Sequence, residues 1–347
     1  MIGQICGWDF APFIQITFTN ISHDGTRLRV IANDIELLFS GDSRWAGREE
    51  KKKKRRVDIH RSDDYISSQC IVSPRIAVSQ LGKNIRLSRI LPCNRGSLVI
   101  AFDHPLVHGP IPGTANPASQ IARFIEGKAD AILLNLGSFR YAADAVKDGP
   151  PQPALIARLD WTTALGTAPI NPASEFRSCL VGHPEDAVRL GADAVITFLL
   201  LGSGDTSFER KEIRRVSAVA RECEQLGIPL IVESLARGKS LRNPNAPEWL
   251  KLHSRVAAEL GADVIKTEYS GDTETMRTVI DACPIPILVL GGTRSGSDEQ
   301  ILQVTQGIVD SGAAGVFFGR NVFQTENIPE LMQRLHAVLR RKQRPAR

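Results

Sequence analysis

Four segments of the chain repeat one short pattern, and this repetition constrains the fold more than any other feature of the sequence. Each segment places a glycine just before an apolar run of strand length; the four are GKADAILLN, LGADAVITF, LGADVIKTE and SGAAGVFFG. Glycine suits the left-handed position that ends a helix. The repetition therefore predicts that a helix is followed by a strand several times along the chain.

From about Ser97 onward, apolar runs alternate with amphipathic patterns that are typical of helices. Strand and helix alternating eight times favour an α/β fold of the (β/α)8 type, the TIM barrel. About 250 residues remain for it, which is the usual size of this fold. A doubly wound open sheet competes, but no GxGxxG motif follows the first strand. The predicted strands are Ser97–Phe102, Ala131–Asn135, Ala154–Asp160, Ala194–Leu200, Pro229–Leu235, Val264–Tyr269, Pro286–Gly292 and Gly315–Arg320, and the clearest helices are Phe208–Leu226, Glu248–Leu260 and Asp298–Ser311.

Residues 1–80 lack this order, and we expect them to form an N-terminal appendage to a barrel domain at residues 81–342. They hold two short β-like runs, Phe13–Phe18 and Leu28–Phe39, and the charged run REEKKKKRR. Such a run can serve as a nuclear-type signal or a nucleic-acid tether, but we expect a solvated charge block. The net charge of +5 leaves the rest of the chain near neutral, so no nucleic-acid surface is predicted.

The composition favours a cytoplasmic protein. No run of about 18 apolar residues is present, so no membrane span is predicted. The N-terminus lacks the basic-then-apolar layout of a signal peptide. The cysteines form no CxxC motif and no zinc-like pair, which favours reduced thiols; they are Cys6, Cys70, Cys93, Cys179, Cys223 and Cys283.

One predicted strand carries a lysine where its sibling strand is apolar. Lys266 in LGADVIKTE matches Ile196 in LGADAVITF, so the fold itself does not require a lysine there. The two-residue period of a strand puts Val264, Lys266 and Glu268 on the face that points into the barrel, with Glu268 nearest the C-terminal mouth. A desolvated lysine can attack a carbonyl and form a Schiff base. The alternative is a structural Lys–Glu pair inside the barrel.

Polar residues at the ends of other strands favour the catalytic alternative. Barrel enzymes need such groups at the C-terminal ends of several strands, whereas a purely structural barrel does not. A positive charge on Arg158 would also repel a positive charge on Lys266 and so could keep the lysine neutral. Taken singly, however, Asp103 could cap a loop, and Arg158 could form an internal ion pair with Asp160. The residues are Asp103 and His104 after the first strand, Arg158 and Asp160 in the third, and Glu233 in the fifth, which points inward if Leu235 does.

Glycines follow the last two predicted strands, in LVLGGTRSGSD and VFFGRNVF. Glycine lets backbone N–H groups approach an anion, and the loops after strands 7 and 8 form the usual phosphate site of this fold. Gly291, Gly292, Gly319 and Arg320 are therefore the predicted phosphate-binding residues, although ordinary turn glycines beside an exposed arginine are the alternative. The segment Gly202-Ser203-Gly204 is a weaker candidate for a second anion contact.

Taken together, AFDHPLVHGP, GADVIKTEYSGD, LGGTR and GRNVFQ resemble the DeoC/FbaB family of class I aldolases. Its members include archaeal-type fructose-bisphosphate aldolases, an aminodideoxyheptulosonate synthase and the autoinducer-2 thiolase. The resemblance covers about residues 82–340. It implies a TIM barrel with a Schiff-base lysine on the sixth strand, which falls on Lys266, and a family aspartate that falls on Asp103. It also implies a phosphate-binding backbone at Gly292, Gly319 and Arg320.

One position departs from the family pattern. The archaeal aldolases carry a tyrosine in a YPRG stretch after the fifth strand, where it moves the proton of C–C cleavage. Here the stretch is LARG, with Leu235 in place of the tyrosine, and leucine cannot move a proton. Either another group serves, with Glu233 or Glu268 the best placed, or the reaction differs.

The sequence thus predicts a metal-independent class I aldolase-type lyase that acts on a phosphorylated ketose or a related carbonyl compound, without a cofactor. Lys266 would form the iminium, and Asp103 or Glu233 would shuttle protons. The alternatives are a thiolase that uses the same lysine for acyl transfer on a phosphorylated dione, a catalytically inactive sugar-phosphate-binding barrel, and a metal-dependent aldolase with His104 and His108 as ligands. The resemblance also implies a homo-oligomer.

Overall fold

The structure, a computed structural model, divides the 347-residue chain into two units, Met1–Ile66 and Ser67–Arg347. In the first, β1 (Ile21–Asp24) pairs antiparallel with β2 (Arg27–Val30). The predicted run Phe13–Phe18, most of Leu28–Phe39 and the charged run REEKKKKRR lie outside the described residues, and the predicted boundary between residues 80 and 81 stays a prediction. The described residues are 21–24, 27–30, 78–145, 152–165, 176–239, 241–294 and 296–340.

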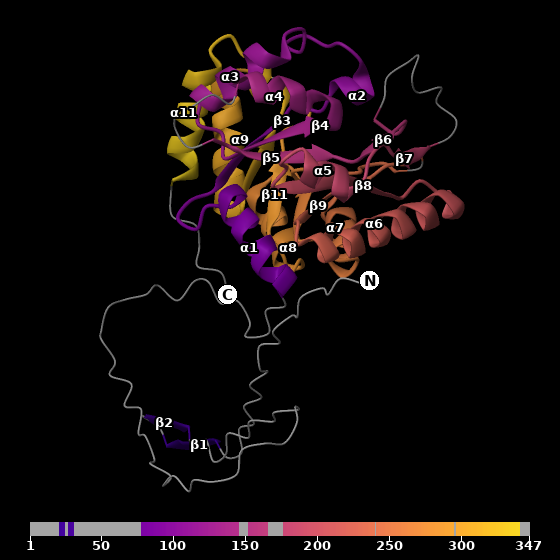
Figure 1. Ribbon diagram of the computed structural model, residues 1–347, viewed down its shortest axis with the longest axis vertical. Helices are drawn as coiled ribbons and strands as arrows, with labels where there is room; N and C mark the ends of the chain where they lie inside the picture. The colour runs from indigo at the N-terminus through magenta and orange to yellow at the C-terminus, as the bar shows by residue number, and fades with distance from the viewer. Residues whose placement is uncertain are drawn as a thin grey trace, which may run out of the picture. The chain divides into compact units, whose positions relative to one another are not determined.

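Eight parallel strands of the second unit close into a barrel, which confirms the predicted (β/α)8 fold (Figure 1). Each strand pairs with the next along the chain, and the last pairs with the first. Every predicted strand is present. The strands are β3 (Ser97–Ala101), β4 (Ala131–Asn135), β5 (Ala154–Arg158), β8 (Ala194–Leu201), β9 (Leu230–Ala236), β10 (Val264–Thr267), β11 (Ile287–Leu290) and β12 (Gly315–Phe318).

Helices connect the strands and surround the barrel (Figure 1). α1 (Val78–Ile90) precedes the first strand, and its Ile90 is buried among the side chains that fill the barrel, so this helix closes the N-terminal end. The other helices are α2 (Pro105–His108), α3 (Pro117–Glu126), η1 (Leu136–Ser138), α4 (Phe139–Ala145), α5 (Pro184–Arg189), α6 (Thr206–Leu226), α7 (Pro247–Glu259), α8 (Thr273–Asp281), α9 (Asp298–Ser311), α10 (Arg320–Phe323) and α11 (Ile328–Leu339).

The alternation of side chains along the strands separates two apolar cores. In β10, Ile265 packs in the core between the strands and the helices, whereas Val264 packs with Ile196 and Ile231 in the core inside the barrel. Lys266 lies two residues after Val264 and therefore points to the inside as well. The strand thus delivers the amine to the C-terminal end of the barrel interior, as the sequence predicts.

One of the four repeated glycines does not take the conformation expected of it. In GKADAILLN the left-handed residue is Lys128, with φ of 60°, while Gly127 has φ of −71°. Gly127 is a glycine for a different reason, because a Cβ there would clash with the Met332 side chain of α11. His336 of the same helix bonds the Lys128 carbonyl at 2.9 Å, so the C-terminal helix packs closely on this turn.

The third predicted strand ends earlier than expected. β5 ends at Arg158, and Asp160 begins β6 (Asp160–Thr162), which pairs antiparallel with β7 (Ser178–Leu180) outside the barrel. The Asp160 carboxylate accepts hydrogen bonds from the Thr197 hydroxyl at 2.6 Å and from the Phe198 amide at 2.8 Å. These bonds to β8 replace the backbone pairing that a longer β5 would make.

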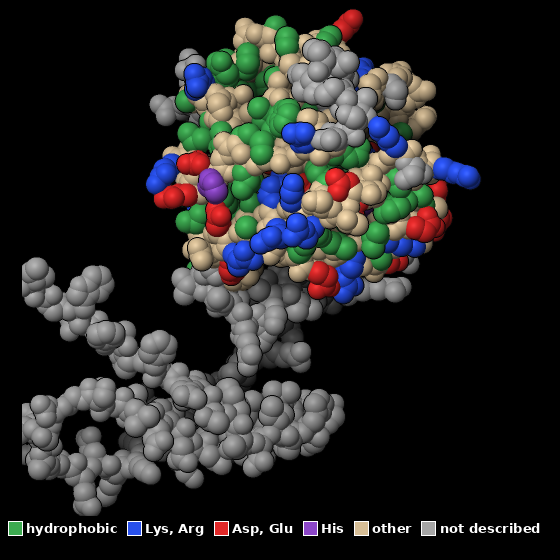
Figure 2. Space-filling model, turned by 90° about the vertical axis from the view of Figure 1, so that its right-hand side faces the viewer, with side chains coloured by type: hydrophobic (Ala, Val, Ile, Leu, Met, Phe, Trp, Pro, Cys, Tyr) green, Lys and Arg blue, Asp and Glu red, His purple; other side chains and the backbone are tan. Residues whose placement is uncertain are grey.

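In the part of the chain that the structure describes, no helix is both long and apolar enough to cross a membrane. The face in Figure 2 carries acidic and basic side chains interspersed with apolar ones. This face therefore presents mixed charge and not one sign of charge.

A buried histidine on the outer side of the barrel is expected to make stability depend on pH. His253 of α7 lies 2.5 Å from the Ser234 hydroxyl, and burial lowers its pKa from 6.5 to about 3. Because the unfolded chain binds this proton more readily, the stabilisation is present above pH 6.5 and is lost as the pH falls toward 3. In His253→Asn, the loss of unfolding free energy between pH 7 and pH 5 should be about 2 kcal/mol smaller than in the unmodified chain.

Urea titrations at the two pH values measure this difference. Ser254→Ala on the same helix is the matched control, because it changes a buried side chain that does not titrate and should leave the pH dependence as it is. Equal pH dependence in all three proteins would contradict the prediction.

Candidate active site

The C-terminal ends of the barrel strands surround a cavity of about 450 Å³. It brings together every residue that the sequence predicts for catalysis, namely Lys266, Asp103, Glu233 and Arg158, and every one predicted for phosphate binding, namely Gly291, Gly292, Gly319 and Arg320. The weaker candidate segment Gly202-Ser203-Gly204 does not line it, and the Ser203 hydroxyl bonds Glu209 at 2.9 Å instead. Apolar walls complete the cavity, formed by Val107, Leu165, Phe198, Leu235, Leu290 and Phe317.

Lys266 lies inside this cavity and is 4% exposed. Its Nζ atom is 2.9 Å from Oε2 of Glu233 and 4.6 Å from the centre of the Phe317 ring. Burying an unpaired ammonium would cost several kcal/mol, and the carboxylate and the ring face both offset that cost. The carboxylate oxygen is also within hydrogen-bonding distance of the amine, where a proton could pass between them.

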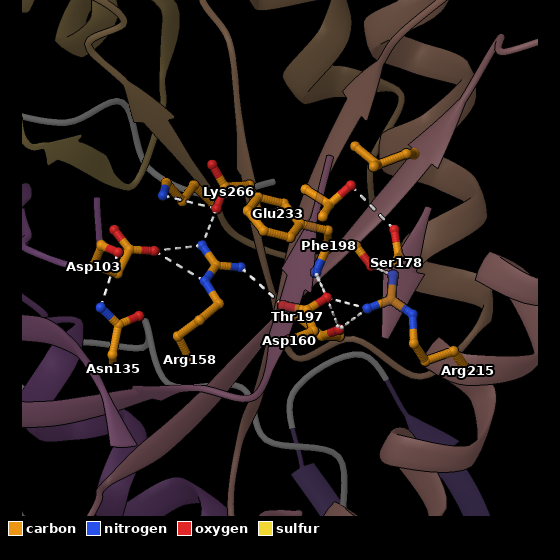
Figure 3. A network of polar contacts seen from close by, with 12 residues as sticks. Asp103, Asn135, Arg158, Asp160, Ser178, Thr197, Phe198, Arg215, Glu233 and Lys266 are labelled. Carbon is orange, nitrogen blue, oxygen red and sulfur yellow. Dashed lines mark hydrogen bonds and ion pairs between the residues drawn. The ribbon is translucent and has the colours of Figure 1, made fainter. Parts of the chain in front are cut away.

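Arg158 is the centre of a buried charge network (Figure 3). Its guanidinium contacts Asp103 at 2.8 and 2.9 Å and Asp160 at 3.4 Å, and it pairs with the same Glu233 oxygen that Lys266 contacts. The Phe198 ring lies 3.9 Å below it. Burial opposes the charge, but the surrounding carboxylates outweigh it and raise the pKa of Arg158. Arg158 and Lys266 therefore share one carboxylate, which offsets the repulsion between them.

Asp103 follows β3 and reaches Arg158 across the barrel mouth. Burial alone would raise the pKa of this carboxyl, but the positive charges of Arg158 and Lys266 hold it below its usual range. The Asn135 side chain at the end of β4 donates to the Asp103 carbonyl oxygen at 2.9 Å and holds its backbone in place. Asp103 is therefore an ionised side chain in a fixed position.

The network continues from Arg158 through Asp160 to α6, and sequence reasoning missed this part. Arg215 pairs with Asp160 and contacts Glu212 at 2.7 Å; Glu212 is buried, and Arg215 is partly buried. A signal was present, because Glu212 stands in the stripe of residues that the helix buries, together with Phe208 and Val216, and Arg215 lies three residues after it. Charged residues within such a stripe predict an internal partner.

Two histidines lie beside the carboxylate at the mouth. The His104 and His108 rings stack with centroids 6.1 Å apart, and Nδ1 of His104 is 3.6 Å from Oδ1 of Asp103. Burial lowers the pKa of His104 to about 4, so this ring is neutral near pH 7. Among the described residues, no three His, Cys, Asp or Glu side chains are grouped so that they could hold a metal ion.

Gly319 is a glycine because of this histidine. A Cβ at position 319 would clash with the His104 ring and with the Ala101 carbonyl. The missing side chain leaves the backbone after β12 open to the cavity, next to Arg320. Within the described part of the chain, the Arg320 side chain makes no hydrogen bond or ion pair, and its Nε atom is buried without a partner. An unpaired guanidinium that lines a cavity is suited to an anionic ligand.

Arg237, by contrast, has an anionic partner, and sequence reasoning missed this residue. It contacts Glu268 at 2.8 and 3.2 Å and donates to the Ala236 carbonyl at 2.7 Å. Both charged side chains line the cavity. Glu268 was predicted as one substitute for the family tyrosine, and the structure places it in this ion pair. Leu235 packs in an apolar cluster with Phe198, so no proton-carrying group stands at that position.

Comparison with known proteins places this geometry in context. The family model of DeoC/LacD family aldolases matches residues 97–325. A 2-amino-3,7-dideoxy-D-threo-hept-6-ulosonate synthase of Halobacterium salinarum is 36% identical over 71% of this chain and 87% of its own length. A class 1 fructose-bisphosphate aldolase of Thermoproteus tenax is 34% identical over 68% and 86%. The solved structure of a Schiff base-forming fructose-1,6-bisphosphate aldolase matches with a TM-score of 0.64 and 29% identity, over 74% of this chain and 98% of that one.

Proposed function

The chain belongs to the DeoC/LacD family of aldolases, and we propose that it is a class I aldolase-type lyase whose Schiff base forms on Lys266. The substrate is a phosphorylated ketose or a related carbonyl compound. One observation carries this proposal: a buried amine, 2.9 Å from a carboxylate, lines the same cavity as an unpaired arginine. The amine supplies the nucleophile, and the arginine supplies the anion site.

The covalent steps begin when Nζ of Lys266, freed of its proton, adds to the substrate carbonyl. Loss of water from the adduct gives an iminium, which is a stronger electron sink than the carbonyl it replaces. A base then removes the proton of the hydroxyl on the far side of the scissile C–C bond. That bond breaks, its electron pair forms an enamine, and an aldehyde leaves. Protonation of the enamine and hydrolysis release the second product.

Two carboxylates can carry these protons. Glu233 contacts Lys266 directly, so it is the group that takes the ammonium proton and returns one for the loss of water. Asp103 is held ionised by Arg158, so its carboxylate is available to accept the proton of the substrate hydroxyl, although the same positive charge makes it a weaker base. Arg158 fixes both carboxylates in place and does not itself exchange a proton. These roles replace the phenol that Leu235 does not provide.

Arg320 and the glycine backbone after β11 and β12 hold the phosphate. Gly292 has φ of 64°, a conformation that other residues rarely adopt, and it lines the cavity with Gly291 and Gly319. A phosphate there accepts hydrogen bonds from Arg320 and from backbone N–H groups. Lys266 then meets a carbonyl close to the phosphate.

Leu235 also supports a second candidate function, an acyl-transferring thiolase that acts on a phosphorylated dione through the same lysine. Such a reaction begins with the same iminium but passes an acyl group to a thiol acceptor. Analysis of the products with and without an acyl acceptor separates the two reactions. A barrel that binds a sugar phosphate without turnover would give neither product.

Borohydride trapping tests the Schiff base. The protein is incubated with dihydroxyacetone phosphate, reduced with sodium borohydride and digested, and the adduct is located by mass spectrometry. We expect one reduced adduct, on Lys266, and a parallel loss of activity. Protein treated with borohydride alone is the control. If neither dihydroxyacetone phosphate nor a panel of phosphorylated ketoses leaves an adduct, Lys266 is an ion-pair partner and the proposed chemistry is wrong.

We propose that the enzyme is a cytoplasmic homo-oligomer that needs neither a cofactor nor a metal. The thiols of Cys93, Cys179, Cys223 and Cys283 are free, which supports a reducing compartment. Sedimentation analysis measures the oligomeric state.

A further inference from the structure

The active-site cavity has two arginine-bearing regions that differ in charge balance. At one, Arg320 lines the cavity without an anionic partner among the described residues. At the other, Arg237 makes two contacts with the Glu268 carboxylate, at 2.8 and 3.2 Å. The first region carries a free positive charge, and the second is close to neutral.

The two regions lie apart around the barrel mouth. Arg320 follows β12, Arg237 follows β9, and Glu268 follows β10; β10 and β11 separate β9 from β12 in the barrel. Lys266 belongs to β10, two residues before Glu268, and lines the cavity next to the pair. A substrate whose phosphate binds Arg320 and whose carbonyl carbon reaches Lys266 therefore extends its other arm toward Arg237 and Glu268.

We propose that the Arg237–Glu268 pair limits the substrate to one phosphate, and that Glu268 is a specificity-determining residue. This inference rests on the proposed function and names its substrate class, a ketose monophosphate or a related carbonyl monophosphate. The arm that reaches the pair carries hydroxyl or other uncharged polar groups. Such groups can donate to the Glu268 carboxylate and accept from the Arg237 guanidinium without breaking the pair.

A second phosphate would meet two obstacles here. The Glu268 carboxylate repels it, because two like charges in a partly desolvated site strongly disfavour each other. Arg237 is already committed to Glu268 and to the Ala236 carbonyl, so it could bind phosphate only by giving up contacts. The Glu268 side chain is 14% exposed, and separating it from Arg237 would leave a mostly buried carboxylate without its partner.

Two sugars that differ in one phosphate test the proposal. Fructose 1-phosphate and fructose 1,6-bisphosphate share every other group, and calorimetry gives the dissociation constant of each. We expect the unmodified protein to bind the monophosphate at least about tenfold more tightly. Glu268→Gln keeps the shape and a hydrogen bond to Arg237 but removes the repelling charge. It should shift the ratio of the two dissociation constants by about tenfold in favour of the bisphosphate.

Glu274→Gln is the matched control, since this exposed glutamate of α8 also pairs with an arginine but lies outside the cavity. It should change neither constant. The proposal is wrong if the unmodified protein binds the bisphosphate as well as the monophosphate, if neither sugar binds, or if Glu268→Gln shifts both constants equally. Trapping of dihydroxyacetone phosphate on Lys266 tests the proposed function separately, because this three-carbon monophosphate has no second arm that could reach Glu268. If the adduct forms but the sugars do not discriminate as expected, only the inference about Glu268 is wrong.

Discussion

Replacing Lys266 with methionine is expected to lower kcat/KM for C–C cleavage by at least about a thousandfold, because no covalent intermediate can form without the amine. The same variant should give no borohydride adduct. Methionine is unbranched and apolar, so it fills the space of the lysine and packs against the Phe317 ring. Kinetics and adduct mapping on the same preparation measure both effects.

The loss in Lys266→Met should be chemical and not structural. Glu233 keeps its pairing with Arg158 after the substitution, so no carboxylate is left alone. We therefore expect the unfolding midpoint and the affinity for inorganic phosphate to change little. Lys211→Met on the exposed side of α6 is the matched control and should keep full activity. Cleavage by Lys266→Met at more than about a tenth of the normal rate would rule out a Schiff base on this residue.

Much of the barrel was predictable because its physical requirements repeat along the chain. Each strand must be apolar to be buried under the helices, and each helix must end before the next strand starts. The repeated segments meet both needs at regular intervals. The two-residue period then placed Lys266 on the same face as Val264, and the structure buries Val264 inside the barrel. Knowledge of the face was enough to place Lys266 at the barrel mouth.

The partners of the charged residues were harder to predict. A strand pattern says which way a side chain points, but not which opposite charge it meets across the barrel. An internal ion pair of Arg158 with Asp160 was one alternative, yet Arg158 also contacts Asp103 and Glu233, and these contacts join three strands that are far apart in sequence. The pairing of Arg237 with Glu268 depends in the same way on which strands are neighbours. The early end of β5 depends on hydrogen bonds from β8 to the Asp160 side chain.

Arg158→Met is expected to lower the free energy of unfolding by about 3–5 kcal/mol at pH 7, the usual cost of removing one partner from a buried ion pair. Three carboxylates contact this guanidinium; without it, Asp160 keeps Arg215 and Glu233 keeps Lys266, whereas Asp103 loses its guanidinium partner. Without it, the pKa of Asp103 should rise above the value in the unfolded chain, so the folded variant binds protons as the pH falls. The difference in unfolding free energy between the variant and the unmodified protein should therefore become smaller as the pH falls from 7 to 5, which urea titrations measure.

A double-mutant cycle separates the loss of charge pairing from the loss of packing against Phe198. In Arg158→Met with Glu233→Gln, the pairing between these two residues can be lost only once, so the combined loss should be smaller than the sum of the single losses by about 1–3 kcal/mol. Arg255 pairs with Glu259 on the exposed face of α7, and Arg255→Met should cost less than about 1 kcal/mol. Two results would mean that Arg158 does not hold the carboxylates together. One is strict additivity of the two losses of unfolding free energy. The other is an Arg158→Met loss that is no larger than the Arg255→Met loss. Coupling would make Arg158 the residue that fixes the positions of both proton-carrying carboxylates around Lys266.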